Sequence, residues 1–169
     1  GIATITLNRP EARNAFSIEM IALWIKALEE VRDNDDIRVL VLTGNGRAFC
    51  AGGDIKAMKS GKGFVDLSGN EEQDFTSTGL KRKNSLWKYV QRIPLLMEEI
   101  DKPTIAAING WCFGGAFTIV ASCDFAIASK KAKFGLSEVN FGKIAGGHVT
   151  KVVSEYFHPR DALYYLLTG

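Results

Sequence analysis

The chain has 169 residues, of which 46% are hydrophobic and 24% charged, and its formal net charge is +2. This length suffices for one domain with a buried core, and the small charge, without a run of Lys or Arg, argues against a nucleic-acid partner. No apolar stretch approaches the roughly 20 residues of a membrane span, so we expect a cytoplasmic or organelle-matrix protein without a membrane partner.

The first part of the chain is predicted to alternate between strand and helix. Ile2–Leu7 is an expected strand that ends at an Asn-Arg-Pro-Glu turn. Ser17 is the expected N-cap of a helix whose apolar spacing continues to Arg32. Residues 37–43 are nearly all apolar, which is typical of a strand in a sheet covered on both faces. A short helix is expected to begin near Asp54.

The remaining segments extend this pattern through one domain over residues 1–169. Residues 60–79 are polar and lack periodicity, which predicts a mobile surface loop within the domain. A helix from about Leu80 to Ile100, kinked by Pro94, is expected to follow. Further expected elements are strands at 104–108, 124–128 and 132–134, and helices at 116–122, 147–156 and 159–167. Alternating apolar strands and helices indicate an α/β fold.

Two glycine-rich turns are the most informative features for function. They comprise residues 48–54 (AFCAGGD) and 110–116 (GWCFGGA). We interpret each as a strand-to-helix turn, where backbone N–H groups lack a helical partner. If the two turns come together, they can direct two N–H donors at one oxygen. Such an arrangement stabilises an oxyanion and indicates thioester chemistry.

Other chemistries find less support in the sequence. Neither turn fits the GxGxxG or GxxxxGK[ST] pattern, and the chain contains no GxSxG. His148 and His158 lie far from any nucleophile in a motif and are interpreted as surface or helix-end residues. Cys50, Cys112 and Cys123 form no CxxC pair, which predicts buried free thiols in a reducing compartment. No cluster has metal-ligand spacing, so no metal site is expected.

A lone carboxylate, Glu138, lies in the apolar, glycine-flanked segment 134–139. Placing a glutamate in such a segment costs free energy unless the carboxyl is hydrogen-bonded or functional. Two interpretations remain open at this point. Glu138 is either a catalytic acid/base or the partner of a structural ion pair.

Taken in order, these motifs resemble the crotonase (enoyl-CoA hydratase/isomerase) superfamily over nearly the whole chain. The residues that carry the resemblance are Ile5–Glu11, Asn14-Ala15, Ala48–Lys56, Lys102–Gly110, Gly114-Gly115, Cys123-Asp124, Ala132–Gly135 and Glu138. Within the family, residues 110–115 and 134–142 are most similar to the hydroxycinnamoyl-CoA (feruloyl-CoA) hydratase-lyases.

The resemblance implies a spiral of ββα units with roughly perpendicular sheets. It also implies coenzyme A thioester substrates, no metal, and no cofactor other than the coenzyme A of the substrate. The expected assembly is a homotrimer or a hexamer. A C-terminal helical region beyond Gly169, which packs between subunits, is a further expectation from the family.

Particular residues acquire implied roles from the same resemblance. The N–H groups of Gly53 and Gly115 would form an oxyanion hole, and Glu138 would be the acid/base. Thr118 stands where hydratases of the family carry a second glutamate, and its hydroxyl can hold a water but cannot serve as a base at neutral pH. Contacts with the CoA thioester are implied for Arg13, Ala15, Ala51, Asp54, Ile55, Lys56, Ser137, Phe141 and Gly146.

The sequence thus predicts a lyase that hydrates an α,β-unsaturated acyl-CoA, with or without retro-aldol cleavage to an aldehyde and acetyl-CoA. Isomerisation or decarboxylation on the same oxyanion hole is one alternative, and a weakly catalytic acyl-CoA-binding protein is another. Three departures from the hydratase-lyases concern the acyl group. Met58 replaces an aromatic residue, Phe141 replaces a tryptophan, and residues 143–145 replace an apolar residue and a proline pair.

Overall fold

The computed structural model describes residues 1–59, 90–146 and 148–169, and its strands form two all-parallel sheets. The four-stranded sheet has the order β1 (Ile2–Leu7), β2 (Val39–Gly44), β4 (Thr104–Ile108) and β6 (Phe125–Ala128). The three-stranded sheet has the order β3 (Ala48–Cys50), β5 (Trp111–Phe113) and β7 (Phe134–Gly135).

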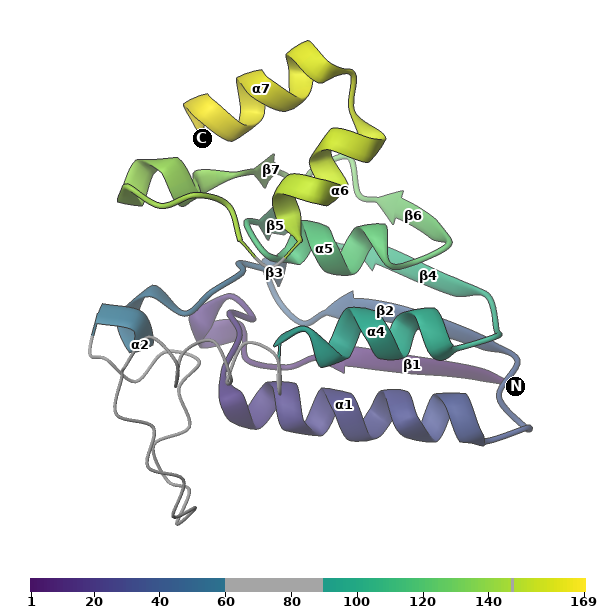
Figure 1. Ribbon diagram of the computed structural model, residues 1–169. Helices are drawn as coiled ribbons and strands as arrows, with labels where there is room; N and C mark the ends of the chain where they lie inside the picture. Colours follow the sequence, from purple (N-terminus) through teal and green to yellow (C-terminus); the bar gives the residue numbers. More distant parts are fainter. Residues whose placement is uncertain (60–89, 147) are drawn as a thin grey trace, which may run out of the picture.

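Consecutive strands after β1 fall in pairs, one strand in each sheet, and a helix follows each pair. The helices are α1 (Ile18–Asp33), α2 (Ile55–Lys59), α4 (Arg92–Glu99), α5 (Ala116–Ala121), α6 (Val149–Tyr156) and α7 (Pro159–Thr168), with short 3-10 helices η1 (Pro10–Ala12) and η3 (Ser137–Phe141). The predicted α/β fold with ββα units is therefore confirmed. In Figure 1, α1 and α4 lie side by side, and α7 lies at the opposite end of the molecule.

Helix α1 begins as its sequence predicts. The Ser17 hydroxyl accepts a hydrogen bond from the Met20 N–H at 3.2 Å and so satisfies one of the free amides of the first turn. The buried residues of α1 recur every three or four positions and are Ile21, Trp24, Leu28 and Val31. This spacing places them on one face, which packs into the core.

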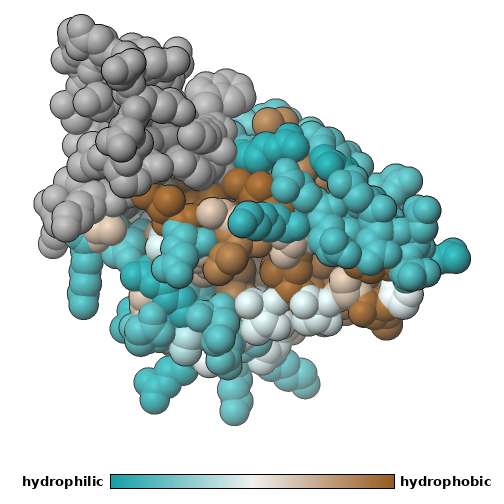
Figure 2. Space-filling view, turned by 90° about the horizontal axis from the view of Figure 1, so that it is seen from below, coloured by the Kyte–Doolittle hydropathy of each residue, from teal (hydrophilic) through white to brown (hydrophobic). Residues whose placement is uncertain are grey.

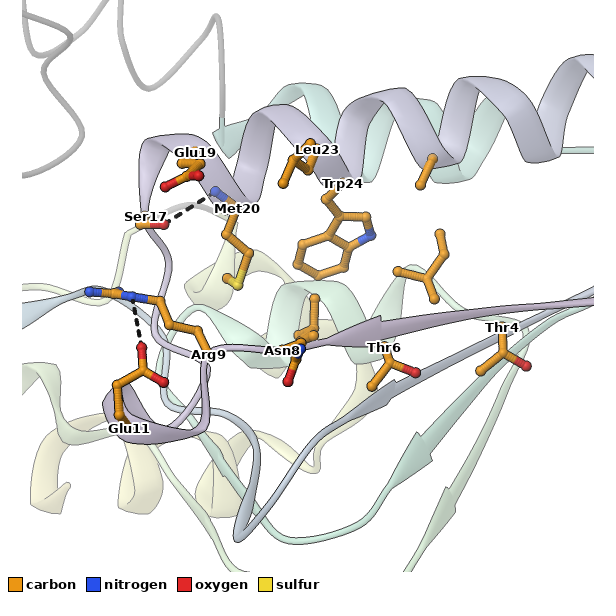
Figure 3. A pocket seen from close by; sticks show the side chains of 13 residues that line it. Thr4, Thr6, Asn8, Arg9, Glu11, Ser17, Glu19, Met20, Leu23 and Trp24 are labelled. Atoms are coloured by element: carbon orange, nitrogen blue, oxygen red, sulfur yellow. Dashed lines mark hydrogen bonds and ion pairs between the residues drawn. The ribbon is translucent and has the colours of Figure 1, made fainter.

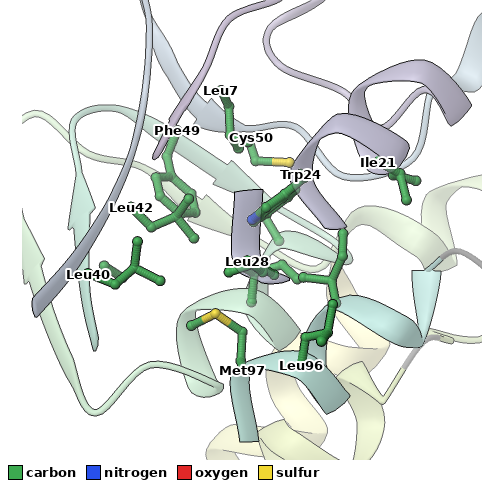
Figure 4. Packing of buried hydrophobic residues seen from close by; sticks show 14 of the residues in the cluster. Leu7, Ile21, Trp24, Leu28, Leu40, Leu42, Phe49, Cys50, Leu96 and Met97 are labelled. Atoms are coloured by element: carbon green, nitrogen blue, oxygen red, sulfur yellow. The ribbon is translucent and has the colours of Figure 1, made fainter. Parts of the chain in front are cut away.

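The main core joins α1 to β2 and α4 (Figure 4). Leu28 of α1, Leu40 and Leu42 of β2 and Leu96 of α4 have no exposed surface. Burying a leucine side chain stabilises a fold by about 1.5–3 kcal/mol. The core therefore fixes β2 relative to the helices, and with it the start of the chain segment that leads into β3 and the first glycine turn.

The structure corrects several predicted boundaries. Each segment interpreted as a glycine turn contains a short strand, because Ala48–Cys50 and Trp111–Phe113 pair with each other. The strand predicted at 132–134 is Phe134–Gly135, and the strand predicted at 37–43 is Val39–Gly44. Strands of two or three residues are too short to show a periodicity of two.

The long helix predicted from Leu80 to Ile100 is described only in part. Its last part is α4, with Pro94 in the first turn, where a missing N–H removes no intrahelical bond. Residues 80–89 of the predicted helix and the loop predicted over 60–79 lie outside the described residues. Among the described parts, no helix combines the length and the apolar character needed to cross a membrane.

Candidate active site

The two glycine turns lie against each other where β3 and β5 end. A Cβ atom on Gly52 would lie 2.7 Å from the Phe113 carbonyl oxygen and 3.2 Å from the Gly115 nitrogen. Gly52 also has a φ of +77°, which side chains disfavour. Glycine at this position therefore lets two segments that are far apart in the sequence come into backbone contact.

Phe16 orients the Gly53 amide. Its backbone N–H donates a hydrogen bond of 2.8 Å to the Gly52 carbonyl, and no peptide bond of the described chain is cis. Because C=O and N–H point in opposite directions in a planar trans peptide, the Gly53 N–H points away from Phe16. None of the residues that the structure describes accepts a hydrogen bond from this N–H.

The Gly115 amide is oriented in the same way. The Phe117 N–H donates to the Gly114 carbonyl at 3.0 Å, so the Gly115 N–H points to the other side of its peptide. Within the described parts of the chain, this N–H also has no acceptor. The two turns thus carry two oriented N–H donors, as an oxyanion hole requires.

The Phe16 side chain links the two turns further. A Cβ atom on Gly115 would lie 3.1 Å from Cε2 of the Phe16 ring. Phe16 therefore holds the first turn through its backbone and contacts the second through its ring. The sequence carries no signal for this role of Phe16, because the role arises from an isolated bridge with Gly53 that has no sequence pattern.

Glu138 lies on η3 with its carboxyl group facing the second turn. Its Oε1 would be 2.9 Å from a Cβ on Gly114, and its Oε2 is buried without a hydrogen-bond partner among the described residues. Burial raises the pKa of Glu138, and the residue's own backbone N–H opposes this effect. No described cation forms an ion pair with Glu138, so the structural ion pair finds no support there. A carboxyl with a raised pKa is suited to proton transfer near neutral pH.

Thr118 lies on α5 and is 5% exposed. It lines a cavity of about 30 Å³ together with Phe16, Ile21, Val90, Ile93, Gly115 and Ile119. A cavity of this volume has room for about one water molecule, although its lining is mostly apolar. Thr118 therefore shares a space with Gly115, whereas Glu138 is not among the residues that line it.

Four residues with an implied CoA contact meet around the first turn. The Ala51 N–H donates to the Arg13 carbonyl at 3.0 Å, and the Arg13 guanidinium lies 4.7 Å from the centre of the Trp111 ring. Ala15 is buried. Asp54 uses its carboxylate within the protein, where the Ala57 N–H and then the Arg9 guanidinium hold the pKa of Asp54 below its usual range.

The other residues with an implied CoA contact lie on two further segments. Ile55 and Lys56 are exposed in the first turn of α2. Ser137 and Phe141 lie on η3 beside Glu138, and Phe141 is 50% exposed. Gly146 lies in the connection between η3 and α6.

A larger cavity of about 600 Å³ lies elsewhere, between β1 and α1. Figure 3 shows Thr6, Arg9 and Trp24 among the side chains around it. On the side of the molecule that carries α1, hydrophobic side chains reach the surface between hydrophilic ones (Figure 2). None of the residues predicted to be catalytic lines this cavity, which borders the outer edge of the four-stranded sheet. The candidate active site is therefore not in this cavity, although the cavity is larger than the one beside Thr118.

The two histidines and two of the three cysteines lie where the sequence predicts them, whereas Cys123 is not fully buried as predicted. Cys50 and Cys112 are buried and Cys123 is half-buried, all three as free thiols, and burial raises the pKa of Cys50 to about 12. His148 and His158 are exposed N-cap residues of α6 and α7. Over the described ranges, no group of three or more His, Cys, Asp or Glu residues could hold a metal ion.

Comparisons with known proteins point to one family. Residues 1–169 match a family model described as enoyl-CoA hydratase/isomerase. The chain is 40% identical over 169 residues to a hydroxycinnamoyl-CoA hydratase-lyase of Pseudomonas fluorescens, covering 100% of this chain and 57% of that protein. It is 36% identical over 169 residues to an (E)-benzylidenesuccinyl-CoA hydratase of Thauera aromatica, covering 99% and 59%.

Solved structures give the same result. An enoyl-CoA hydratase subunit I of Geobacillus kaustophilus superposes with a TM-score of 0.79 at 36% identity, covering 99% of this chain and 58% of that one. An enoyl-CoA hydratase/isomerase of Mycobacterium paratuberculosis has a TM-score of 0.80 at 34% identity, covering 99% and 59%. The chain therefore spans less than two thirds of the length of these relatives.

Proposed function

The chain belongs to the enoyl-CoA hydratase/isomerase family, the crotonase superfamily, and on this basis we propose that the protein is an enzyme that adds water to an α,β-unsaturated acyl-CoA. One observation carries the proposal. The N–H groups of Gly53 and Gly115, which find no acceptor among the described residues, lie on two turns in backbone contact, and the Glu138 carboxyl faces the second of these turns.

In the proposed reaction, the thioester carbonyl oxygen accepts hydrogen bonds from Gly53 and Gly115. Addition of water to the β-carbon moves electrons toward this oxygen, and the two N–H groups stabilise the resulting negative charge. A preorganised donor of this kind contributes about 3–4 kcal/mol to the transition state. The carbonyl hydrogen bonds of Gly52 and Gly114 keep both donors oriented before substrate binds.

Glu138 is the proposed acid/base. Its carboxylate accepts a proton from water as the water oxygen bonds to the β-carbon, and it then returns a proton to the α-carbon. Thr118 cannot replace it, because a threonine hydroxyl does not act as a base at neutral pH. A single carboxyl therefore performs both proton transfers.

Retro-aldol cleavage after hydration is the second candidate. The observation that favours it is the 40% identity to a hydroxycinnamoyl-CoA hydratase-lyase. In this reaction the bond between the α- and β-carbons of the β-hydroxyacyl-CoA breaks. The β-carbon leaves as an aldehyde, and the hydroxyl proton ends on the α-carbon of acetyl-CoA.

The proposed assembly rests on the family resemblance, and the proposed location is the default expectation from the sequence. A homotrimer or hexamer in the cytoplasm is the proposed form, with the acyl-CoA thioester as the small-molecule partner. Neither a metal nor a separate cofactor takes part in the proposed steps. The coenzyme A of the substrate supplies the thioester.

The test is product analysis with crotonyl-CoA, feruloyl-CoA and a 3-enoyl-CoA. Hydration adds the mass of one water, cleavage gives an aldehyde and acetyl-CoA, and isomerisation moves the double bond without a change in mass. Loss of carbon dioxide from a carboxyacyl-CoA would instead support decarboxylation. Binding of all these esters without turnover would contradict the proposal and favour a weakly catalytic acyl-CoA-binding protein.

Glu138→Gln provides the matched test of the acid/base. We expect kcat to fall about 10²- to 10⁴-fold, the usual contribution of general acid–base catalysis, with little change in the affinity for CoA esters. Glu155→Gln, on the exposed surface of α6, is the control and should keep the original kcat. A fully active Glu138→Gln variant would remove this mechanism.

A further inference from the structure

We infer that the ion pair between Arg9 and Asp54 is a positioning device that holds the Gly53 N–H in line with the thioester oxygen. This inference rests on the proposed function, because it presupposes that Gly53 donates to that oxygen. The two charged groups form an ion pair with each other and hydrogen bonds with the backbone. They are positioning residues and not catalytic ones.

Asp54 directly follows Gly53 in the chain, and its carboxylate is held at both oxygens. Oδ2 lies 2.8 Å from Nη1 of Arg9, and Oδ1 accepts a hydrogen bond of 3.0 Å from the Ala57 N–H. The Asp54 side chain is only 13% exposed, so water competes little for this carboxylate. These contacts fix the chain on the C-terminal side of Gly53.

The same Arg9 nitrogen also holds the opposite segment. Nη1 donates to the Ala15 carbonyl at 3.1 Å, and the next residue, Phe16, donates its N–H to the Gly52 carbonyl at 2.8 Å. One guanidinium nitrogen therefore joins the two segments on either side of the bridge between Phe16 and Gly53. The peptide that carries the Gly53 N–H lies between these fixed points.

The Arg9 backbone is held by a hydrogen bond, so its side chain extends from a fixed position. The Arg9 N–H donates to Oδ1 of Asn14 at 2.8 Å, and Asn14 has no exposed surface. Nδ2 of Asn14 donates to the Ala48 carbonyl at 2.8 Å, in the strand that leads into the first turn. The loop that begins at Arg9 and the first glycine turn thus form one hydrogen-bonded frame.

A structural ion pair and a positioning device make different predictions. Loss of a structural pair lowers stability and leaves the bound thioester unchanged in the folded fraction. Loss of a positioning device changes how strongly the N–H polarises the carbonyl. The vibrational frequency of the bound thioester carbonyl reports this polarisation directly, because a stronger hydrogen bond weakens the C=O bond.

The experiment measures the infrared band of butyryl-CoA labelled with carbon-13 at its carbonyl. This saturated ester has no double bond to hydrate, so it remains unreacted in the site. Asp54→Asn and Arg9→Lys are the test variants. Glu11→Gln is the matched control, because Glu11 approaches the same guanidinium at 3.8 Å with a side chain that is 73% exposed.

In the original protein, the band should move to lower wavenumber on binding. Asp54→Asn should lose half or more of this shift, and kcat with crotonyl-CoA should fall about 10- to 100-fold while KM changes little, the pattern of a misplaced transition-state contact. Arg9→Lys should retain an intermediate shift, because lysine keeps the charge without the fixed fork of donors. Glu11→Gln should match the original protein in both measurements.

Two outcomes would overturn the inference, and they are distinguishable from failure of the proposed function. An unchanged band and kcat in folded Asp54→Asn would show that the pair does not position the amide. If Asp54→Asn does not fold, an unchanged carbonyl band in Arg9→Lys would also show that the ion pair does not position the amide. Absence of both a band shift and turnover in the original protein would instead overturn the proposed function, and the inference with it.

Discussion

At the scale of single residues, the missing side chain of Gly52 allows the two turns to touch. We expect Gly52→Ala to lower the free energy of unfolding by at least about 1–2 kcal/mol, the cost of a side chain at positive φ. Because the added Cβ would lie 2.7 Å from the Phe113 carbonyl oxygen, the turns must also separate, and kcat should fall about 100-fold. Denaturant unfolding and steady-state kinetics provide the two measurements.

Gly46→Ala is the control for this prediction. Gly46 has a φ of +81° and faces the Pro10 side chain instead of the site. Its substitution should cost a similar backbone strain and leave kcat unchanged. Equal kinetic effects of the two substitutions would show that strain, and not separation of the turns, limits the activity.

The buried carboxyl of Glu138 predicts a particular dependence of stability on pH. Burial raises the pKa of Glu138 in the folded protein, so the group favours folding below about pH 4, the ordinary range of glutamate, and this contribution is lost as the pH rises through the folded value. Glu138→Gln removes the titration. We expect the variant to have a higher Tm than the original protein near neutral pH and an equal Tm near pH 4. A lower Tm of the variant at neutral pH would contradict a desolvated carboxyl.

At the scale of elements, the C-terminal end of α1 depends on one lysine. Nζ of Lys102 donates to the carbonyls of Val31, Arg32 and Asn34 at 2.6, 3.1 and 2.9 Å. Lys102→Met should lower the free energy of unfolding by about 1–3 kcal/mol, because carbonyls without helical partners lose a charged donor. Lys26→Met, on the exposed surface of α1, should have a much smaller effect in the same denaturant titration.

The elements also show why sequence patterns predict some features and miss others. The strand at Ile2–Leu7 and the Ser17 cap follow from periodicity and capping chemistry over many residues, and the structure confirms both. The strands Ala48–Cys50 and Trp111–Phe113 contain three residues each, so their pairing depends on contacts between segments about sixty residues apart. Such pairing leaves no local signal.

The same distinction applies to the candidate site. The resemblance of these motifs, in their order, to the crotonase family implies functional roles for Gly53, Gly115 and Glu138. What orients the two amides is a set of hydrogen bonds to neighbouring carbonyls, made by Phe16 and Phe117. Tertiary hydrogen bonds of this kind follow from the fold and not from residue type, and for this reason Phe16 and Arg9 could be identified only from the structure.

At the scale of the whole molecule, the two edge strands of the four-stranded sheet, β1 and β6, differ in how they can pair with another chain. All four residues of β6 are exposed, with Phe125 at 60% and Ile127 at 65%. Exposed apolar side chains on an edge strand favour pairing with another chain.

Since a homotrimer or hexamer is proposed, we expect sedimentation equilibrium to give a mass above that of one chain. The double variant Phe125→Lys, Ile127→Lys should shift this mass toward the monomer. Ile2→Lys changes an apolar residue that is 73% exposed on β1, at the other edge, and should leave the mass unchanged. A monomeric original protein, or equal effects at both edges, would exclude β6 as the associating edge.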